Sequence, residues 1–357
     1  EYYLGALSAP VAAADLVLLA APETHEVLAL DAKSGEVRWR FAAGGKVDSP
    51  PTLANGLALF GCDDGSIYAL HAATGRLAWK FRAGPREAAS LHNGHLASAY
   101  PLPGSVLVLG DTVFAVAGHH TDLGGLHAWA LELATGKPRA RRTIVGDQPR
   151  VVTNGVAVAD AEGTGFWIGQ QLHLAFDLSD LPTASFEGPK PPISFDRNGT
   201  RLRFRTAQGR GGSTHGWKGA MQVLGRNRFL RAHRLALSEE LGFGLRDPES
   251  PNQQQPMLWG TKLDSEEAEP LWQRAPAELG TADSYGALLA AGDRLFVGGG
   301  SRHGDSGVLH AVDAASGRLL QSVELPARVT ECGLALAGGR LYVTLENGVV
   351  VCLGEER

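Results

Sequence analysis

The chain has 357 residues, of which 44% are hydrophobic and 20% are charged, and its formal net charge is −5. No apolar run is long enough to span a bilayer and no basic stripe is present, so the sequence argues against a membrane span and against nucleic acid as a partner. Three cysteines (Cys62, Cys332 and Cys352) are too few and too scattered for a disulfide framework. The chain opens without a basic segment or a cleavage pattern, so no signal peptide is visible.

One pattern occurs twice near the start of the chain, in residues 29–41 and again in residues 69–81. Each copy has an alternating apolar run, a polar turn that ends in glycine, and a second run that carries a large aromatic residue. These features predict a β-hairpin, because short polar side chains and glycine favour tight turns. The two copies are 40 residues apart at their glycines and at their tryptophans, which are Gly35, Gly75, Trp39 and Trp79.

A second pair of strand signals precedes the hairpin, as in residues 55–65, and the same pattern returns in residues 338–348. Four short antiparallel strands in about 40–45 residues predict one blade of a β-propeller. The large aromatics are expected to pack between neighbouring blades, because their spacing equals the blade period. Blades are predicted at residues 10–41, 50–81 and 102–143, with a polar linker at 82–99.

The repeat is lost for 181 residues between the partial copies that contain Gly136 and Gly317. Three units of about 60 residues or four of about 45 fit this interval. Three are favoured, which gives seven blades, with eight as the alternative. The favoured units are 149–206, 218–275 and 284–325, and the protruding loops are expected near 182–192, 206–216 and 247–256.

The C-terminal unit, residues 330–353, has only three strand signals. Residues 1–7 are strand-like and precede the first complete unit, so they are expected to supply the missing fourth strand and to close the propeller. The prediction is therefore an all-β fold: a single β-propeller domain of four-stranded antiparallel blades that spans residues 1–357.

The hairpin unit resembles the PQQ-like, or quinoprotein dehydrogenase-like, β-propeller repeat. Residues 29–41 and 69–81 match its Asp-Ala-x-[Ser/Thr]-Gly…Trp signature well, and residues 130–137 and 311–319 match it in part. The stretches 44–51, 59–65 and 79–86 are similar to uncharacterised bacterial members of this family. The resemblance implies an extracytoplasmic protein, either periplasmic or secreted.

Relatives with this repeat include quinone-dependent alcohol dehydrogenases and a scaffold lipoprotein of the outer-membrane β-barrel assembly machine that binds no cofactor. The dehydrogenases are known for an adjacent Cys-Cys disulfide against the quinone and for a carboxylate and amide set that holds a metal. In this chain no two cysteines are adjacent and no Asp-x-Asp pair lies in a recognisable metal loop. The usual PQQ site residues are therefore not recognisable, no catalytic residue is assigned, and no metal site is expected.

Several polar loops are candidate binding sites. His119, His120 and Asp122 lie in a glycine-rich loop and could form part of a metal or ligand site. Adjacent residues on an extended backbone point to opposite sides, however, so solvated loop residues are the preferred interpretation. His215 and Trp217 could line a pocket at the mouth of the propeller.

His303 and Asp305 lie in a loop at the position equivalent to 118–125, so both loops are expected on one face, the predicted binding face. His92 and His95 flank Asn93-Gly94, which is not a helical sequence, and a solvated linker is the preferred interpretation.

The sequence thus favours a non-enzymatic binding or scaffold propeller that presents a loop-rich face to a protein, a glycan or a small ligand. It is expected to be a monomer or a domain of a larger protein. The alternatives are a PQQ-dependent oxidoreductase with a divergent site, and a polysaccharide lyase or hydrolase that uses the central cleft.

Overall fold

The computed structural model describes residues 7–13, 15–92, 95–119, 121, 124–145, 157–159, 165–168, 172–179, 193–197, 200–207, 220–225, 228–232, 234–238, 240–246, 257–262, 270–275, 278–280, 284–301 and 306–354. The chain divides into two compact units. Unit 1 contains Glu1–Thr183, Ala337–Tyr342 and Cys352–Arg357, and unit 2 contains Ala184–Leu336 and Val343–Val351.

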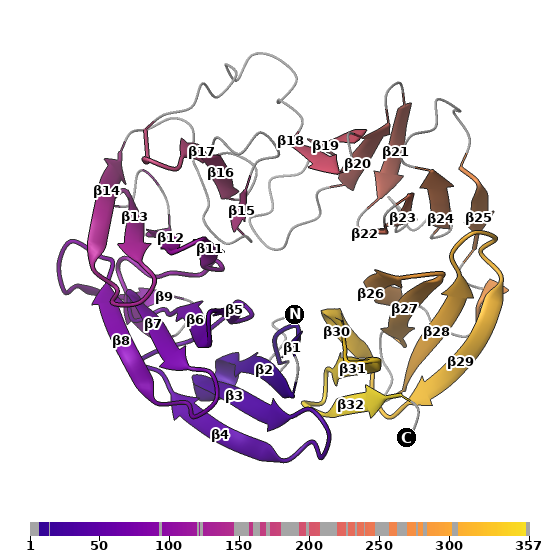
Figure 1. The fold of residues 1–357 in the computed structure, drawn as a ribbon, viewed down its shortest axis with the longest axis horizontal. Helices are drawn as coiled ribbons and strands as arrows, with labels where there is room; N and C mark the ends of the chain where they lie inside the picture. Colours follow the sequence, from indigo (N-terminus) through magenta and orange to yellow (C-terminus); the bar gives the residue numbers. More distant parts are fainter. Residues whose placement is uncertain are drawn as a thin grey trace. The chain divides into compact units, whose positions relative to one another are not determined.

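Unit 1 begins with consecutive antiparallel sheets whose strands follow one another in chain order (Figure 1). The first sheet contains β1 (Val11–Ala13), β2 (Leu16–Ala21), β3 (Glu26–Asp31) and β4 (Val37–Ala42), with the 3₁₀ turn η1 (Pro22–Thr24) between β2 and β3. The second contains β5 (Thr52–Ala54), β6 (Leu57–Gly61), β7 (Ser66–His71) and β8 (Leu77–Arg82). A two-stranded sheet follows, β9 (Ala89–His92) and β10 (His95–Ser98). The next sheets contain β11 (Leu107–Leu109), β12 (Thr112–Ala117), β13 (Leu126–Glu132) and β14 (Pro138–Ile144), and then β15 (Ala157–Ala159), β16 (Gly165–Ile168) and β17 (Leu172–Ala175).

Unit 2 has the same antiparallel, sequential order. Its sheets contain β18 (Ile193–Arg197), β19 (Thr200–Ala207), β20 (Ala220–Gly225) and β21 (Arg228–Ala232); then β22 (Arg234–Leu237), β23 (Leu241–Arg246), β24 (Met257–Lys262) and β25 (Trp272–Arg274); then β26 (Ser284–Ala291), β27 (Arg294–Gly300), β28 (Gly307–Asp313) and β29 (Leu319–Leu325). The last sheet contains β30 (Val329–Ala337), β31 (Arg340–Leu345) and β32 (Val350–Leu353), and its residues are divided between the two units.

The sheets confirm the predicted all-β class of four-stranded antiparallel units. The described residues form six four-stranded sheets, two three-stranded sheets and the β9–β10 hairpin. Four sheets, rather than the three favoured units, lie between Gly136 and Gly317, because β18–β21 pair with one another across the expected boundary at 206–218. The number of blades remains a prediction, because these sheets are counted only within the described residues.

Closure of the propeller and the single-domain organisation remain predictions, because residues 1–6 lie outside the described residues. The predicted loops near 182–192, 206–216 and 247–256 also lie outside them, except for Thr206 and Ala207, which belong to β19.

The hairpin turns follow from the polar residues and glycines of the repeat. In the first sheet, one Asp31 carboxylate oxygen accepts hydrogen bonds from the backbone N–H groups of Lys33 and Ser34, both at 2.8 Å. Gly35 then adopts a φ of 73°, a left-handed conformation that glycine enters without strain. The equivalent glycines all have a φ of 68°: Gly75, Gly136 and Gly317.

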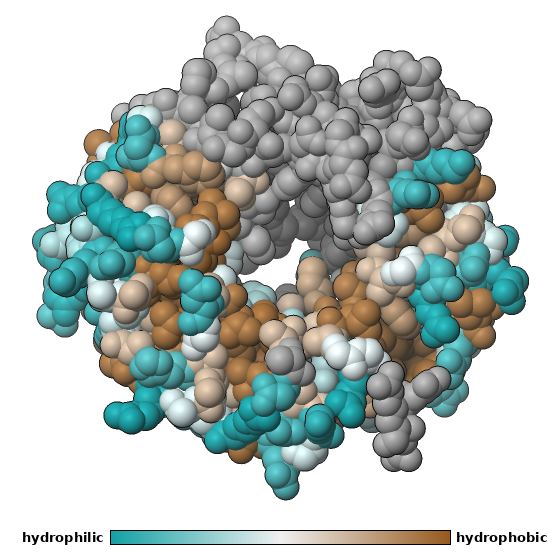
Figure 2. All heavy atoms as spheres, viewed as in Figure 1, coloured by the Kyte–Doolittle hydropathy of each residue, from teal (hydrophilic) through white to brown (hydrophobic). Residues whose placement is uncertain are grey.

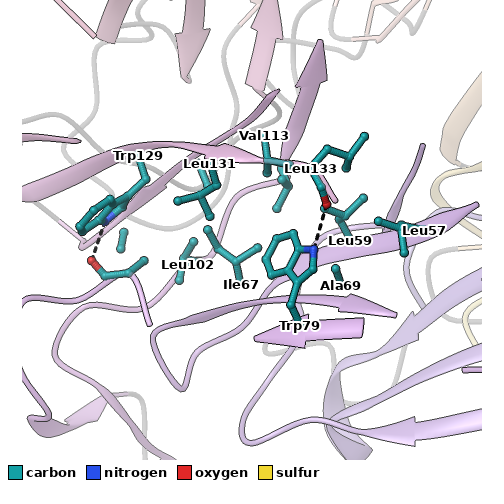
Figure 3. Close-up of a cluster of buried hydrophobic side chains, with 14 of the residues drawn as sticks. Leu57, Leu59, Ile67, Ala69, Trp79, Leu102, Val113, Trp129, Leu131 and Leu133 are labelled. Carbon is teal, nitrogen blue, oxygen red and sulfur yellow. Dashed lines mark hydrogen bonds between the residues drawn. The ribbon is translucent and has the colours of Figure 1, made fainter. Parts of the chain in front are cut away.

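Tryptophans connect each of three sheets to the sheet that follows. The Trp39 Nε1–H donates to the Ala72 carbonyl at 2.8 Å, and the Trp79 Nε1–H donates to the Leu133 carbonyl at 2.9 Å (Figure 3). In unit 2, Trp272 donates in the same way to the Ala314 carbonyl. Each indole also covers the turn glycine of the next sheet. For example, a Cβ added to Gly136 would lie 2.6 Å from the Trp79 ring.

Other side chains take the place of tryptophan at two further junctions in unit 1. Arg142 of β14 donates to the Leu178 carbonyl at 2.9 Å. The Tyr342 hydroxyl of β31 donates to the Ala32 carbonyl, also at 2.9 Å. At four of these junctions the acceptor immediately follows the strand that precedes the hairpin turn, whereas Leu178 lies three residues after the end of β17.

The core lies within and between these sheets. In unit 1 one cluster joins the second and third four-stranded sheets and includes Leu59, Ile67, Trp79, Trp129 and Leu131 (Figure 3). Hydrophilic side chains gather over outer strands such as β4 and β8, and hydrophobic ones lie toward the inner strands (Figure 2). This pattern is that of amphipathic sheets packed face to face.

Candidate functional site

The β9–β10 hairpin is the main departure from the repeat within the described part of unit 1. It lies in the connection between β8 and β11, which the sequence analysis interpreted as a solvated linker. This connection carries a regular hairpin, in which Ala89–His92 pairs with His95–Ser98 in an antiparallel register. In the sequence, the Asn93-Gly94 dipeptide is a strong signal for a two-residue hairpin turn.

The hairpin is anchored at its base to the β6–β7 turn, Cys62–Gly65. The Ser98 N–H donates to the Asp63 carbonyl at 2.7 Å, and the Ala99 N–H closes the base of the hairpin by donating to the Ala88 carbonyl at 2.7 Å. A Cβ added to Gly65 would lie 2.6 Å from the Ser98 hydroxyl oxygen, so the turn and the hairpin are in close contact. We call the turn and the hairpin together the hairpin surface.

Leu91 and Leu96 face each other across the two strands of the hairpin. Their exposed fractions are 76% and 77%, the highest among the large hydrophobic side chains in the described part of the chain. Side chains at directly opposite positions of an antiparallel pair lie on the same face and within contact distance. The two leucines therefore form one continuous apolar patch on a rigidly attached element.

Asp64 lies beside the hairpin and is held by a hydrogen-bond network. One of its carboxylate oxygens accepts from the Tyr68 hydroxyl at 2.6 Å and from the Lys80 ammonium at 2.9 Å, and this ammonium also lies 4.6 Å from the centre of the Tyr68 ring. Burial alone would raise the pKa of Asp64, but the bonds from Tyr68 and Lys80 outweigh it and lower the pKa. Asp64 is therefore a fixed negative charge.

Asp63 has a different environment in the same turn. Burial, together with repulsion from Asp48 and Asp64, raises the pKa of Asp63 to about 7, although Lys46 acts in the opposite direction. Burial also raises the pKa of the neighbouring Cys62 thiol, so this cysteine is not an activated nucleophile.

A buried histidine supports the other side of the hairpin. Tyr100, which follows β10, packs edge-on against His127 with ring centres 5.1 Å apart. The two His127 ring nitrogens lie 3.3 Å from the Gly124 carbonyl and 3.3 Å from the Thr143 hydroxyl. Burial lowers the pKa of His127, which suits a neutral structural ring better than a charged group.

Six of the seven residues predicted as binding residues lie outside the described residues: His120, Asp122, His215, Trp217, His303 and Asp305. His119 is described and lies, partly buried, in the loop that follows β12. The structure thus does not bring the predicted set together into one described site, and these residues remain predictions. The leucines of the hairpin were missed because exposed apolar residues in a polar linker give no periodic signal.

The described residues contain no group of three or more histidine, cysteine, aspartate or glutamate side chains placed to hold a metal ion. Cys62, Cys332 and Cys352 form no disulfide bonds, and only Cys62 is buried. No helix in the described part of the chain has the length and hydropathy needed to cross a membrane.

Comparisons with known proteins agree on the fold. A family model described as "Outer membrane protein assembly factor BamB" matches residues 4–173 and 260–356. The chain resembles the quinohemoprotein alcohol dehydrogenase of Comamonas testosteroni with a TM-score of 0.62 and 15% identity, over 96% of this chain and 70% of that one. It resembles the computationally designed protein Ika8 with a TM-score of 0.58 and 12% identity, over 99% of this chain and 97% of that one.

The comparison with BamB from Moraxella catarrhalis gives a TM-score of 0.42 and 15% identity, over 95% of this chain and 79% of that one. No curated protein matches the sequence. At these identities the structural likenesses show the β-propeller fold alone.

Proposed function

This chain belongs to the BamB family of PQQ-like β-propellers, and from that premise we propose that it is a non-catalytic scaffold that binds a protein partner through the hairpin surface. The family is described by its role in outer membrane protein assembly. Under this proposal the chain works outside the cytoplasm, in complexes with other proteins.

The observation that carries the proposal is the exposed Leu91–Leu96 pair. Two opposed leucines offer apolar area without hydrogen-bonding groups, which fits a protein contact better than a glycan. Burial of both side chains by a partner would contribute about 2–4 kcal/mol. Because the hairpin is already attached to Asp63 and Tyr100, little conformational entropy is lost when it binds a partner.

The fixed charge of Asp64 gives the same surface a polar border. Apolar centres with polar margins are the usual anatomy of protein interfaces. A basic side chain of the partner near Asp64 would favour one orientation of binding, since opposite charges across an interface set register and association rate.

A binding experiment tests the proposal directly. The partner is the purified outer-membrane β-barrel assembly machine, immobilised and titrated with the chain. The double variant Leu91→Ser/Leu96→Ser should bind at least about tenfold more weakly, a loss of about 1.4 kcal/mol. Val37→Ser is the matched control, because Val37 is a 44% exposed apolar residue of β4 and should leave binding unchanged. Equal binding by the double variant and the wild type, or no binding by the wild type, would overturn the proposal.

The non-catalytic part of the proposal has its own test. The purified chain is titrated with pyrroloquinoline quinone, with and without calcium, and followed by absorbance and tryptophan fluorescence. We expect no saturable binding. Saturable binding would refute the non-catalytic scaffold and support the quinone-dependent oxidoreductase instead.

A further inference from the structure

The outer strand of the β26–β29 sheet differs from the outer strands of the other four-stranded sheets. Each of the other five described sheets of this size ends in a strand that carries arginine or lysine: β4, β8, β14, β21 and β25. β29 reads Leu-Leu-Gln-Ser-Val-Glu-Leu and contains no arginine, lysine or proline. Charged residues and proline are the common means by which proteins protect a sheet edge from pairing with another chain.

β29 is also long and open to solvent. It has seven residues, as many as β14 and more than the other outer strands of the four-stranded sheets. It is the last strand in the order β26-β27-β28-β29, with Ser322 opposite His310 of β28. Leu320 is 40% exposed, and Gln321, Ser322 and Glu324 are exposed as well. Within the described part of the chain, no strand pairs with the outer side of β29, so that side is available for a further strand.

The sequence of β29 is complementary to itself. In an antiparallel pair of two β29 strands with a twofold axis at Ser322, Leu320 stands opposite Glu324 of the other copy, and Leu319 stands opposite Leu325. The single charged residue of the strand is therefore never opposite itself, which would be unfavourable.

Charge complementarity adds to this pairing. Arg318 immediately precedes β29 and is exposed. In the same register it lies diagonally across from Glu324 of the other copy and on the same face. Diagonal neighbours are about 7–8 Å apart, within reach of long side chains. The twofold symmetry produces two such pairs.

We propose that β29 is a homodimerisation edge, at which two copies of this chain join their β26–β29 sheets into one continuous sheet. The interface is isologous, because the same strand contributes both sides. One strand pair buries less area than a stable interface needs, so the dimer is weak and reversible. This inference concerns a surface other than the hairpin surface and is independent of the proposed function.

Disulfide trapping tests the register. The background variant is Cys332→Ser/Cys352→Ser, which removes the two exposed thiols. Adding Ser322→Cys places one thiol of each copy at the twofold axis, where opposite residues are within disulfide range. Adding Leu320→Cys instead is the matched control, because its two copies would be four positions out of register, about 13 Å apart.

Mild oxidation should convert the Ser322→Cys variant, and not the Leu320→Cys variant, into a covalent dimer. Circular dichroism establishes that both variants are folded. No dimer with Ser322→Cys, or equal amounts with both, would overturn the proposal.

Sedimentation velocity at increasing concentration tests the charge pair. Arg318→Glu and Glu324→Arg should each weaken the wild-type dimer several-fold, and the double variant should restore it. Rescue cannot arise within one copy, because the two residues are about 20 Å apart along an extended strand. A wild-type chain that stays monomeric at every concentration, or a double variant weaker than both single variants, would contradict the dimer. Leu91→Ser/Leu96→Ser should leave dimerisation unchanged, which separates this inference from the proposed function.

Discussion

The junctions between consecutive sheets are of two kinds. From the first sheet to the second, and from the second to the β11–β14 sheet, an indole N–H reaches a backbone carbonyl and the ring covers a glycine. From the β11–β14 sheet to the β15–β17 sheet, Arg142 reaches the equivalent carbonyl of Leu178. The backbone carbonyl that accepts the hydrogen bond is therefore the constant part of the junction, whereas the side chain that donates it can differ.

The reason lies in the burial of the acceptor residues. Ala32, Ala72, Leu133, Leu178 and Ala314 are all at most 6% exposed. A buried carbonyl without a donor is costly, so each of these positions needs a hydrogen bond from the neighbouring sheet. Tryptophan, arginine and tyrosine can all reach it, but only tryptophan also fills the space above the turn glycine.

The largest expected effect comes from removal of an indole. Trp79→Ala should lower the free energy of unfolding by about 3–5 kcal/mol, because it leaves a cavity and removes the donor to Leu133. Chemical denaturation of both proteins measures the change. Arg142→Ala is the comparison and should cost less, about 1–2 kcal/mol, since it removes the bond but little buried apolar area. Equal losses in the two variants would show that the two kinds of junction are equivalent.

A smaller effect should follow from a methyl group added beneath the indole. Gly136→Ala forces alanine into a φ of 68° and places its Cβ 2.6 Å from the Trp79 ring, so it should cost about 3 kcal/mol. Gly110→Ala is the matched control, because Gly110 has a φ of 57° but no atom within 4 Å of an added Cβ. The control should lose about 1 kcal/mol through backbone strain alone. A loss in Gly136→Ala no larger than that of the control would mean that the ring moves freely.

The smallest effect concerns two equivalent turns that differ in their charges. The Asp63 N–H donates to the Lys46 carbonyl just as the Glu346 N–H donates to the Arg328 carbonyl. Glu346 forms an ion pair with Arg328 at 3.6 Å, whereas Asp63 is repelled by Asp48 and Asp64.

The pKa of Asp63 is raised from 3.8 to about 7, so the folded chain holds this proton more tightly than the unfolded chain. Its contribution to stability is therefore complete below the unfolded pKa and is lost as the pH rises through the folded value. Asp63→Asn should then be about 2 kcal/mol more stable than the wild type at about pH 8 and equal to it near pH 4. Thermal unfolding across this range measures the difference. Glu346→Gln is the control and should not increase stability at high pH. An increase in stability in this control, or no increase in Asp63→Asn, would contradict the assigned role of Asp63.

The same comparison explains what the sequence could and could not predict. The first sheets were predictable because the turn glycine and the tryptophan that covers it recur with a fixed spacing, at Gly35 and Gly75 and at Trp39 and Trp79. The strands β15, β16 and β17 lie within the predicted unit 149–206. Their grouping into larger units was wrong, because strand pairing after residue 190 depends on contacts that leave no periodic signal.

The loss of the signal after Gly136 has a physical cause in the junction. Ala140 stands in β14 where the earlier outer strands have tryptophan, and Leu178 adopts a φ of 66° in the next turn, where no glycine marks it. The donor Arg142 lies two residues after Ala140. The tryptophan and the turn glycine of the repeat are therefore both missing, although the hydrogen bond to the Leu178 carbonyl is made. The hairpin surface was missed for a related reason, since exposed Leu91 and Leu96 obey no core periodicity.

Because every junction has the same kind of acceptor carbonyl and the donor side chain can differ, the stability of each junction can change independently of the others. Every such bond connects one sheet only to a neighbouring one, so the cooperativity of the molecule is the product of local couplings rather than of one central core. A junction without an indole over a glycine, such as the one held by Arg142, is then expected to open at a lower free energy than the tryptophan junctions. Evolution can weaken the coupling at one junction without altering either sheet, and in this chain the arginine junction lies after the β11–β14 sheet, which contributes His127 against Tyr100.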